Sequence, residues 1–319
     1  CPINSKYTLL YFIIMKNIDW ASLSFGYMPT DYNVRCYYRN GSWGEIEVSS
    51  SEYIPMHMAA TCDVVHLAQI IMELCGTYAI SPIPNSDGHS PCRYGLHPVT
   101  TLTRIASYAH TFRMRGGTKT LRAALHIAMD GSASPAETTL SLAMSLPHEM
   151  GGYGFPTPIL NAEVSVPESF LGKVGGATYR PDAFWQGAYS DLEYQSTEYH
   201  LDPLAATALV AAHGIDPRAD PEAAVWRRGL ISKADADQRR MRDLQSLGLH
   251  VIPVTSFDLQ SVRRLDQVAY ALLRQFEKHA SWDVCWSADE RFAELDEHTW
   301  YQARRILLQE LQPSITVLP

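Results

Sequence analysis

The order of helical and strand patterns after Ser134 restricts the possible folds of this chain more than any other feature. In some segments apolar residues recur with helical spacing, and in others they run continuously or alternate with period two. The predicted elements are a helix over 134–146, strands over 159–166, 179–185 and 189–196, helices over 204–212, 220–230 and 234–247, a strand over 249–255, and helices over 262–278 and 292–311. This order favours an α/β domain built on a mixed sheet.

The chain before Ser134 has a different order of strand and helix patterns. Two β-rich runs, over 32–38 and 43–48, flank Asn40-Gly41, a pair that is typical of a tight hairpin turn. After Cys62 the apolar spacing becomes helical. It predicts a helix from Asp63 that stops at Cys75-Gly76, and further helices over 102–112 and 118–129. We expect four segments, which cover residues 1–62, 63–130, 131–275 and 276–319.

Composition excludes several classes of protein. Hydrophobic residues make up 46% of the 319 residues, which is typical of a globular chain and excludes low-complexity disorder. The 26 basic and 34 acidic residues give a formal net charge of −8, so any contact with DNA has to come from a local patch. None of the six cysteines forms a C-x-x-C pair, and we expect reduced thiols without zinc.

The first residues do not resemble a membrane anchor or a signal peptide. The apolar run Tyr7–Ile14 is far shorter than the roughly 20 residues needed to span a bilayer. Lys6 is the single charge before it, and no small-residue cleavage site follows. We interpret residues 1–14 as an upstream or non-native extension, and we expect a cytoplasmic protein that does not contact membranes.

Acidic residues gather on two neighbouring predicted strands. Asp182 lies on the first, and Glu193 and Gln195 lie on the second, two residues apart and therefore on one face. If the strands pair through a turn at Gln186-Gly187, Asp182 comes close to Glu193. Two converging carboxylates form a hard-oxygen pocket that suits Mg²⁺, and such an ion can activate water for phosphodiester hydrolysis.

Segment 131–273 resembles the PD-(D/E)XK superfamily of restriction-endonuclease-like domains, in the branch of the very-short-patch repair endonucleases and similar bacterial domains. The motifs that carry this resemblance are Ser134-Pro135-x-Glu137, Gly151-Gly152-Tyr153-Gly154-x-Pro156, Asp182, Glu193-Tyr194-x-Ser196, His200, Asp237-x-Arg239-Arg240 and Gly248-x-x-Val251-Ile252-x-Val254-Thr255. The resemblance implies a mixed sheet flanked by helices and a Mg²⁺-dependent DNA endonuclease. Asp182 and Glu193 would hold the metal, Glu137 would assist, and residues 63–130 would be an accompanying helical region.

Gln195 departs from the family pattern, which has Asp, Glu or Lys at this position. An amide brings no charge and cannot act as a base. Metal binding would be weakened or catalysis lost, while the fold would survive. A non-catalytic module that binds nucleic acid or protein is therefore a second hypothesis.

Several of these residues also have a purely structural interpretation. Glu137 follows Ser134 by three residues with Pro135 between them, which is the pattern of a helix capping box. Asp182 follows Pro181 and can simply begin a strand. Arg239 and Arg240 fit a solvated helix face, or phosphate contact together with Arg242.

Residues 16–62 resemble the start of a bacterial branched-chain amino acid aminotransferase. The matching pieces are Asn17-Ile18-Asp19-Trp20, Phe25-Gly26-Tyr27-Met28, Thr30-Asp31-Tyr32 and His57-Met58-Ala59-Ala60-Thr61. The likeness stops at Cys62, and no later lysine has the context of the residue that holds pyridoxal phosphate in that family. We expect no pyridoxal phosphate and no transaminase activity, and we interpret this segment as an inactive fragment joined by a fusion or a merged reading frame.

Overall fold

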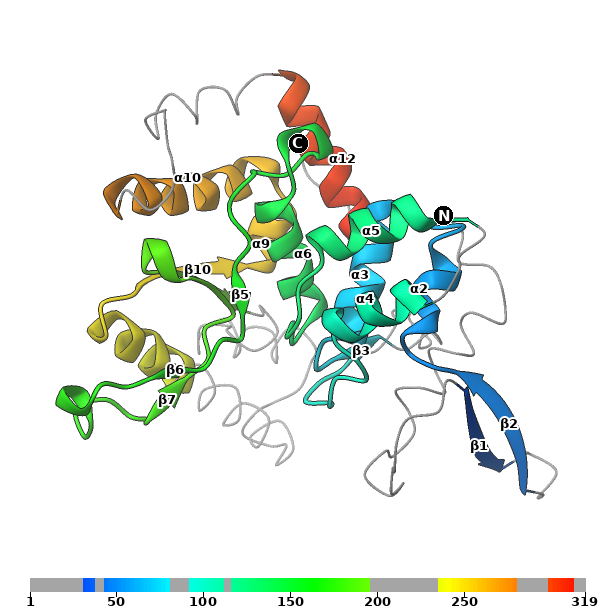
Figure 1. The fold of residues 1–319 in the computed structure, drawn as a ribbon. Coiled ribbons are helices and arrows are strands. Elements are labelled where there is room, and N and C mark those ends of the chain that lie inside the picture. Colours follow the sequence, from blue (N-terminus) through cyan, green and yellow to red (C-terminus); the bar gives the residue numbers. More distant parts are fainter. Residues whose placement is uncertain are drawn as a thin grey trace, which may run out of the picture. The chain divides into compact units, whose positions relative to one another are not determined.

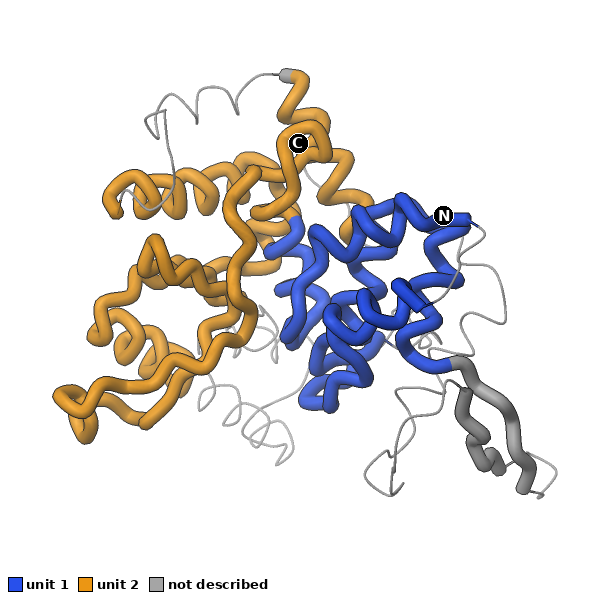
Figure 2. Tube along the Cα trace, in the orientation of Figure 1, with its two compact units in different colours: residues 1–142 blue, residues 143–319 orange. Residues whose placement is uncertain are grey.

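The computed structural model describes residues 31–37, 43–80, 92–111, 116–195, 235–279 and 298–312. The chain divides into two compact units, residues 1–142 and 143–319, which Figure 2 colours separately. Helix α6 (Pro135–Ser145) runs through the boundary between them. The architecture is mixed α/β, with helices and small sheets (Figure 1). The finer division into four segments stays a prediction.

The predicted hairpin is present in the first unit. Strands β1 (Asp31–Tyr37) and β2 (Trp43–Ser49) pair antiparallel, with Asp31 opposite Ser49 and Tyr37 opposite Trp43. The Asn40-Gly41 pair, which we expected to form the turn, lies outside the described residues.

Short helices make up the core of the first unit. They are α2 (Tyr53–Met58), α3 (Val64–Leu74), α4 (Leu102–Thr111) and α5 (Thr118–Ile127), and a two-residue ladder joins β3 (Ala79–Ile80) to β4 (Cys92–Arg93). Helix α3 begins where predicted, because the Asp63 side chain accepts a hydrogen bond from the His66 backbone N–H at 2.9 Å. Its inner face buries Leu67, Ile71 and Met72 completely.

The second unit is organised around a four-stranded sheet. Its strand order is β10-β9-β8-β5, and the strands span His250–Thr255, Ser190–Gln195, Ala183–Trp185 and Ile159–Leu160. The β9–β10 pair is parallel and the other two pairs are antiparallel, so the sheet is mixed as expected. The predicted turn at Gln186-Gly187 is the short 3-10 helix η4 (Gln186–Ala188) that joins β8 to β9.

Helices cover both faces of this sheet. The helical segment 235–246 packs on one face, where Leu244 joins a buried cluster with Val251, and the half-buried Phe184 packs against this cluster. On the other face Trp185 contacts Phe155, which stacks on Phe276 of α10 (Val262–His279). The sheet is thus a middle layer, and a polar residue on either face is shielded from water by a helix.

Two smaller features complete the second unit. A second ladder pairs β6 (Val164–Ser165) with β7 (Thr178–Tyr179), so the single strand predicted over 159–166 is in fact β5 and β6, which belong to different sheets. Helix α12 (His298–Leu311) is held to α10 by the buried Arg304, whose Nε lies 2.9 Å from Asp266 Oδ1. The remaining elements are η2 (His148–Met150), η3 (Glu168–Phe170) and α9 (Ser256–Leu259).

The glycine-rich motif at 151–154 has a structural explanation. Gly151 and Gly154 adopt φ of +84° and +66°, a left-handed conformation that favours glycine. A Cβ on Gly151 would collide with the carbonyl oxygen of Ala303, and one on Gly152 would collide with that of Leu146. The motif therefore serves close backbone packing. The helices predicted over 204–212 and 220–230 lie outside the described residues.

Candidate functional site: an acidic cluster closed by an arginine

The pairing of β8 with β9 brings the two predicted carboxylates together. Ala183 lies opposite Leu192, and one further step in the same register places Asp182 opposite Glu193. Asp182 Oδ2 accepts a hydrogen bond from the Tyr194 N–H at 2.8 Å, and the Asp182 N–H lies 3.4 Å from Glu193 Oε1. Both side chains are nearly buried, with exposed fractions of 9% and 5% for the two residues. They face one shared space, as the sequence predicted.

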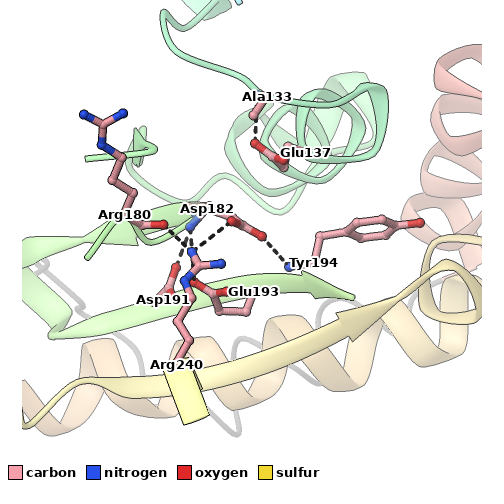
Figure 3. Close-up of polar contacts among 9 residues, drawn as sticks. Ala133, Glu137, Arg180, Asp182, Asp191, Glu193, Tyr194 and Arg240 are labelled. Carbon is pink, nitrogen blue, oxygen red and sulfur yellow. Dashed lines mark hydrogen bonds and ion pairs between the residues drawn. The ribbon is translucent and has the colours of Figure 1, made fainter. Parts of the chain in front are cut away.

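Arg240 lies in that shared space. One terminal nitrogen of Arg240, on the helical segment 235–246, lies 2.9 Å from Glu193 Oε1 and 3.3 Å from Asp182 Oδ1. The same nitrogen donates to the carbonyl oxygen of Arg180 (Figure 3). Burial acts to lower the pKa of the guanidinium, but the charges of Glu193 and Asp182 outweigh it and raise the pKa above its ordinary value. Arg240 is therefore firmly charged and bridges the carboxylates.

A third carboxylate, Asp191, belongs to the same cluster and was missed by the sequence prediction. It is fully buried and lies on the same face of β9 as Glu193. Its Oδ1 accepts from the Ala183 N–H at 3.3 Å, and its carboxyl group also has a side-chain hydrogen bond with Glu193. Burial, followed by the neighbouring Glu193 and Asp182, raises the pKa of Asp191 well above its ordinary value. The period-two spacing of Asp191 and Glu193 was a signal that could have revealed it.

The donor atoms of this cluster fit a divalent cation in kind, but their spacing in this structure does not fit one. Carboxylate oxygens from two paired strands are the ligands that Mg²⁺ prefers, at about 2.1 Å. The guanidinium holds the nearest oxygens 2.9 and 3.3 Å from its nitrogen, too far for metal bonds to the same centre. Among the described residues, no group of three or more His, Cys, Asp or Glu side chains is arranged to hold a metal ion.

The other predicted site residues take different positions. Gln195 is on the acidic face of β9, and its Nε2 lies 3.2 Å from Met241 Sδ on the helix that carries Arg240. Arg239 is exposed and forms an i,i+4 ion pair with Asp235. Arg242 is also exposed, with its Nε 3.3 Å from the Gln238 carbonyl. Arg239 and Arg240 were both expected to contact phosphate. Arg239 is exposed in a surface ion pair, whereas Arg240 is held in the acidic cluster.

Glu137 has the local contacts of a helix cap in the first unit. Its N–H donates to Ser134 Oγ at 3.1 Å, and its Oε2 accepts from the Ala133 N–H at 2.9 Å. The first bond satisfies a backbone N–H group that the start of α6 leaves free, and the second ties the residue ahead of Ser134 to the first helical turn. The structural interpretation of Glu137 therefore accounts for its position without catalysis, and its catalytic role stays a prediction.

Comparison with known proteins gives a limited result. No family profile matches the chain, and no solved structure matches it. A branched-chain-amino-acid aminotransferase of Helicobacter pylori (strain J99 / ATCC 700824) is 32% identical over 59 residues, which is 18% of this chain and 17% of that protein. The chain thus spans less than a fifth of that relative, which is of the same family that the amino-terminal motifs resemble.

One property of the helices bears on membranes. In the ranges that the structure describes, none of the helices is both long and apolar enough to cross a bilayer.

Proposed function

We propose that the second unit is a restriction-endonuclease-like domain that acts on DNA and uses the acidic cluster for Mg²⁺-dependent phosphodiester hydrolysis. One observation carries this proposal: Asp182 and Glu193, from two paired strands, already share one cationic group. Carboxylate oxygens that converge from two neighbouring strands are the kind of ligand that Mg²⁺ takes. A metal ion bound there would supply an activated water and would stabilise the charge that develops on the phosphodiester.

The surroundings of the cluster give further support. The carboxylates lie on a mixed sheet with a helix over the acidic face, as expected from the resemblance of residues 131–273. Asp191 is a buried acid with a strongly raised pKa, and such groups concentrate at functional sites. Arg239 and Arg180 have exposed side chains in surface ion pairs, which are weak enough to open for a DNA phosphate.

The test is a nicking assay with supercoiled plasmid and the full chain in Mg²⁺ or Mn²⁺. We expect nicking that a chelator stops and that Asp182→Asn and Glu193→Gln abolish. The matched control is Glu163→Gln, which removes an exposed carboxylate from a surface pair with Arg180 and should leave the activity unchanged. Intact plasmid at high concentrations of folded protein and metal would remove the hydrolase from consideration.

A second function, a non-catalytic DNA-binding module, is favoured by two particular observations. Arg240 already neutralises the pair of carboxylates, and Gln195 stands where an acid or a lysine would assist chemistry. This alternative predicts DNA binding that a chelator leaves unchanged, with no nicking. Gln195→Asp discriminates between the two, because nicking that appears only in this variant indicates a site that has lost its chemistry and kept its fold. Binding to a protein but not to DNA would contradict both.

A further inference from the structure

We propose that the ring of Tyr189 is a stacking site for an unpaired nucleobase, and that Lys278 and His250 hold the phosphate attached to that base. We call the surface formed by Tyr189, His250, Lys278 and His279 the tyrosine platform. None of its members belongs to the acidic cluster, so the proposal goes beyond the hydrolysis proposed above.

The backbone of Tyr189 has a conformation that a bulky residue rarely adopts. Its φ is +47° and its ψ is +39°, in the left-handed region that favours glycine and asparagine. Two hydrogen bonds hold it there: its N–H donates to the Gln186 carbonyl at 3.2 Å, and its carbonyl accepts from the His250 N–H at 2.7 Å. Asparagine or glycine would suit this turn better, so the turn alone does not explain a tyrosine. Residues held in such conformations concentrate at functional sites.

The Tyr189 ring does not serve the core of the second unit. The residue is 56% exposed. Its ring contacts that of His279, the last residue of α10, with 5.2 Å between the ring centroids and 45° between the ring planes. This separation is ordinary for an aromatic pair. His279 therefore orients the ring from one side, and the exposed part can receive a second ring.

Groups that suit a phosphate lie beside this ring. His250 begins β10 and Lys278 directly precedes His279, and all three side chains are exposed. Burial, followed by the charge of Lys278, lowers the pKa of His250, so the Lys278 ammonium lies near an imidazole that is mostly uncharged at neutral pH. An imidazole N–H and an ammonium group both donate hydrogen bonds, and phosphate oxygens accept them.

A structural explanation covers only part of the tyrosine platform. Lys278 and His279 lie in the last turn of α10, where positive side chains offset the negative end of the helix dipole. This role explains neither the exposed ring nor the unfavourable backbone of Tyr189. A stacked base explains both, because stacking on an aromatic side chain requires a ring that is exposed and held in a fixed direction.

The experiment measures binding of a short, fluorescein-labelled single-stranded oligothymidylate to the full chain by fluorescence anisotropy, in a chelator so that hydrolysis plays no part. Tyr189→Asn removes the ring and accepts the left-handed backbone. Its binding should weaken by on the order of tenfold or more, while its melting temperature stays the same or rises. Tyr189→Phe keeps the ring and should bind as wild type does.

The matched control is Phe257→Ala. Phe257 is 55% exposed and has the Arg264 guanidinium 6.0 Å from its ring centroid, but it lies in α9, at the other end of β10 from the platform. This variant should bind the oligonucleotide as wild type does. A strand of the same length without bases should bind weakly to every protein, because it offers charge but no ring. Competition by thymidine monophosphate as effective as by the oligonucleotide would identify a free nucleotide as the ligand of the same platform.

The proposal is overturned if folded wild type does not bind the oligonucleotide, if Tyr189→Asn binds it as wild type does, or if the strand without bases binds equally well. A lower melting temperature of Tyr189→Asn with unchanged binding would show that the ring serves only the fold. If Tyr189→Asn does not fold, Tyr189→Leu keeps an apolar side chain without a ring, and the same binding results apply to it. The two proposals fail separately: binding that depends on Tyr189 without plasmid nicking contradicts the hydrolase alone, and nicking with binding that ignores Tyr189 contradicts the platform alone.

Discussion

At the scale of single residues, Asp191 is the most unusual group in the described part of the second unit. It is a buried acid whose neighbours are two further acids, and Arg240 is the cation that offsets their charge within the described residues. Each carboxyl that is ionised there makes ionisation of the next one harder. Asp191 therefore binds a proton more tightly in the folded protein than in the unfolded chain.

This difference predicts how stability depends on pH. Because the folded protein binds the Asp191 proton more tightly, the protonated group stabilises the folded state. This stabilisation is fully present below the unfolded pKa, about 3.9 for Asp. It is lost as the pH rises through the higher folded pKa. Asp191→Asn cannot ionise and keeps an oxygen that can accept from the Ala183 N–H. We expect it to be more stable than wild type at pH 8 by about 1 kcal/mol or more, with the difference shrinking toward pH 4. Thermal unfolding across this range is the measurement, and a variant less stable at every pH would contradict it.

The adjacent arginines Arg239 and Arg240 should differ sharply in their effect on stability. Arg240→Ala leaves Asp182 and Glu193 without their shared cation, which should lower the free energy of unfolding by about 1–3 kcal/mol after allowance for its partial exposure. Arg239→Ala removes only a surface ion pair and should cost less than about 0.5 kcal/mol. Denaturant titration of both proteins measures this, and equal losses would show that Arg240 does not hold the cluster together.

The residues of the cluster were predictable from sequence to different degrees. Asp182 and Glu193 could be paired because Asp182 directly precedes β8, Glu193 lies on β9, and a short turn joins these two strands. Asp191 had the same period-two signal and was overlooked. The role of Arg240 could not be predicted, because Arg240 lies far from β9 along the chain. Its approach to the acids depends on tertiary packing rather than on local spacing.

At the scale of elements, the position of the helical segment 235–246 controls the site. Besides Arg240 it carries Asp243, whose Oδ2 accepts from the Tyr179 hydroxyl at 2.6 Å and from the Gly175 N–H at 3.0 Å. These bonds connect the helix to the β6–β7 ladder and lower the pKa of Asp243 below its ordinary value. The helix is thus held in place by the hydrogen bonds of Asp243 as well as by the burial of Leu244.

Loss of that contact should loosen the helix. Asp243→Ala should cost about 1 kcal/mol, because solvent screens this partly exposed group, whereas Asp235→Ala on the exposed face should cost less than about 0.5 kcal/mol. The depressed pKa adds a pH signature: the stabilisation is present above the ordinary pKa of Asp and is lost as the pH falls through the lower folded value. Unfolding titrations at pH 7 and pH 3 test this, and a difference between wild type and Asp243→Ala that grows in acid would contradict it.

The glycine motif gives a steric prediction at the same scale. Gly152→Ala should destabilise the second unit by about 1–3 kcal/mol, since the added Cβ collides with the Leu146 carbonyl. Gly116→Ala is the matched control, because a Cβ there meets open space and the backbone needs no left-handed conformation. Calorimetric melting of the two variants should separate them. A Gly152→Ala protein as stable as the Gly116→Ala protein would mean that the backbones approach less closely than described.

At the scale of the whole molecule, the α/β order of the second unit could be predicted and its strand pairing could not. Hydrophobic periodicity located β9, β10 and α10, because each has a regular pattern of its own. The parallel pairing of β10 with β9 joins strands that are distant in sequence, and nothing in either strand encodes the partner. That pairing places the helix with Arg240 over the acidic face, so the closure of the site is a property of the assembled sheet.

The central claim is that Asp182 and Glu193, which Arg240 bridges, serve Mg²⁺-dependent hydrolysis of DNA. Nicking of supercoiled plasmid by the full chain tests it most directly, with Asp182→Asn and Glu193→Gln compared with the surface variant Glu163→Gln. We predict that wild type and Glu163→Gln nick the plasmid in Mn²⁺ and that both cluster variants do not. Intact plasmid with folded wild-type protein, or nicking that the cluster variants retain, would contradict the account.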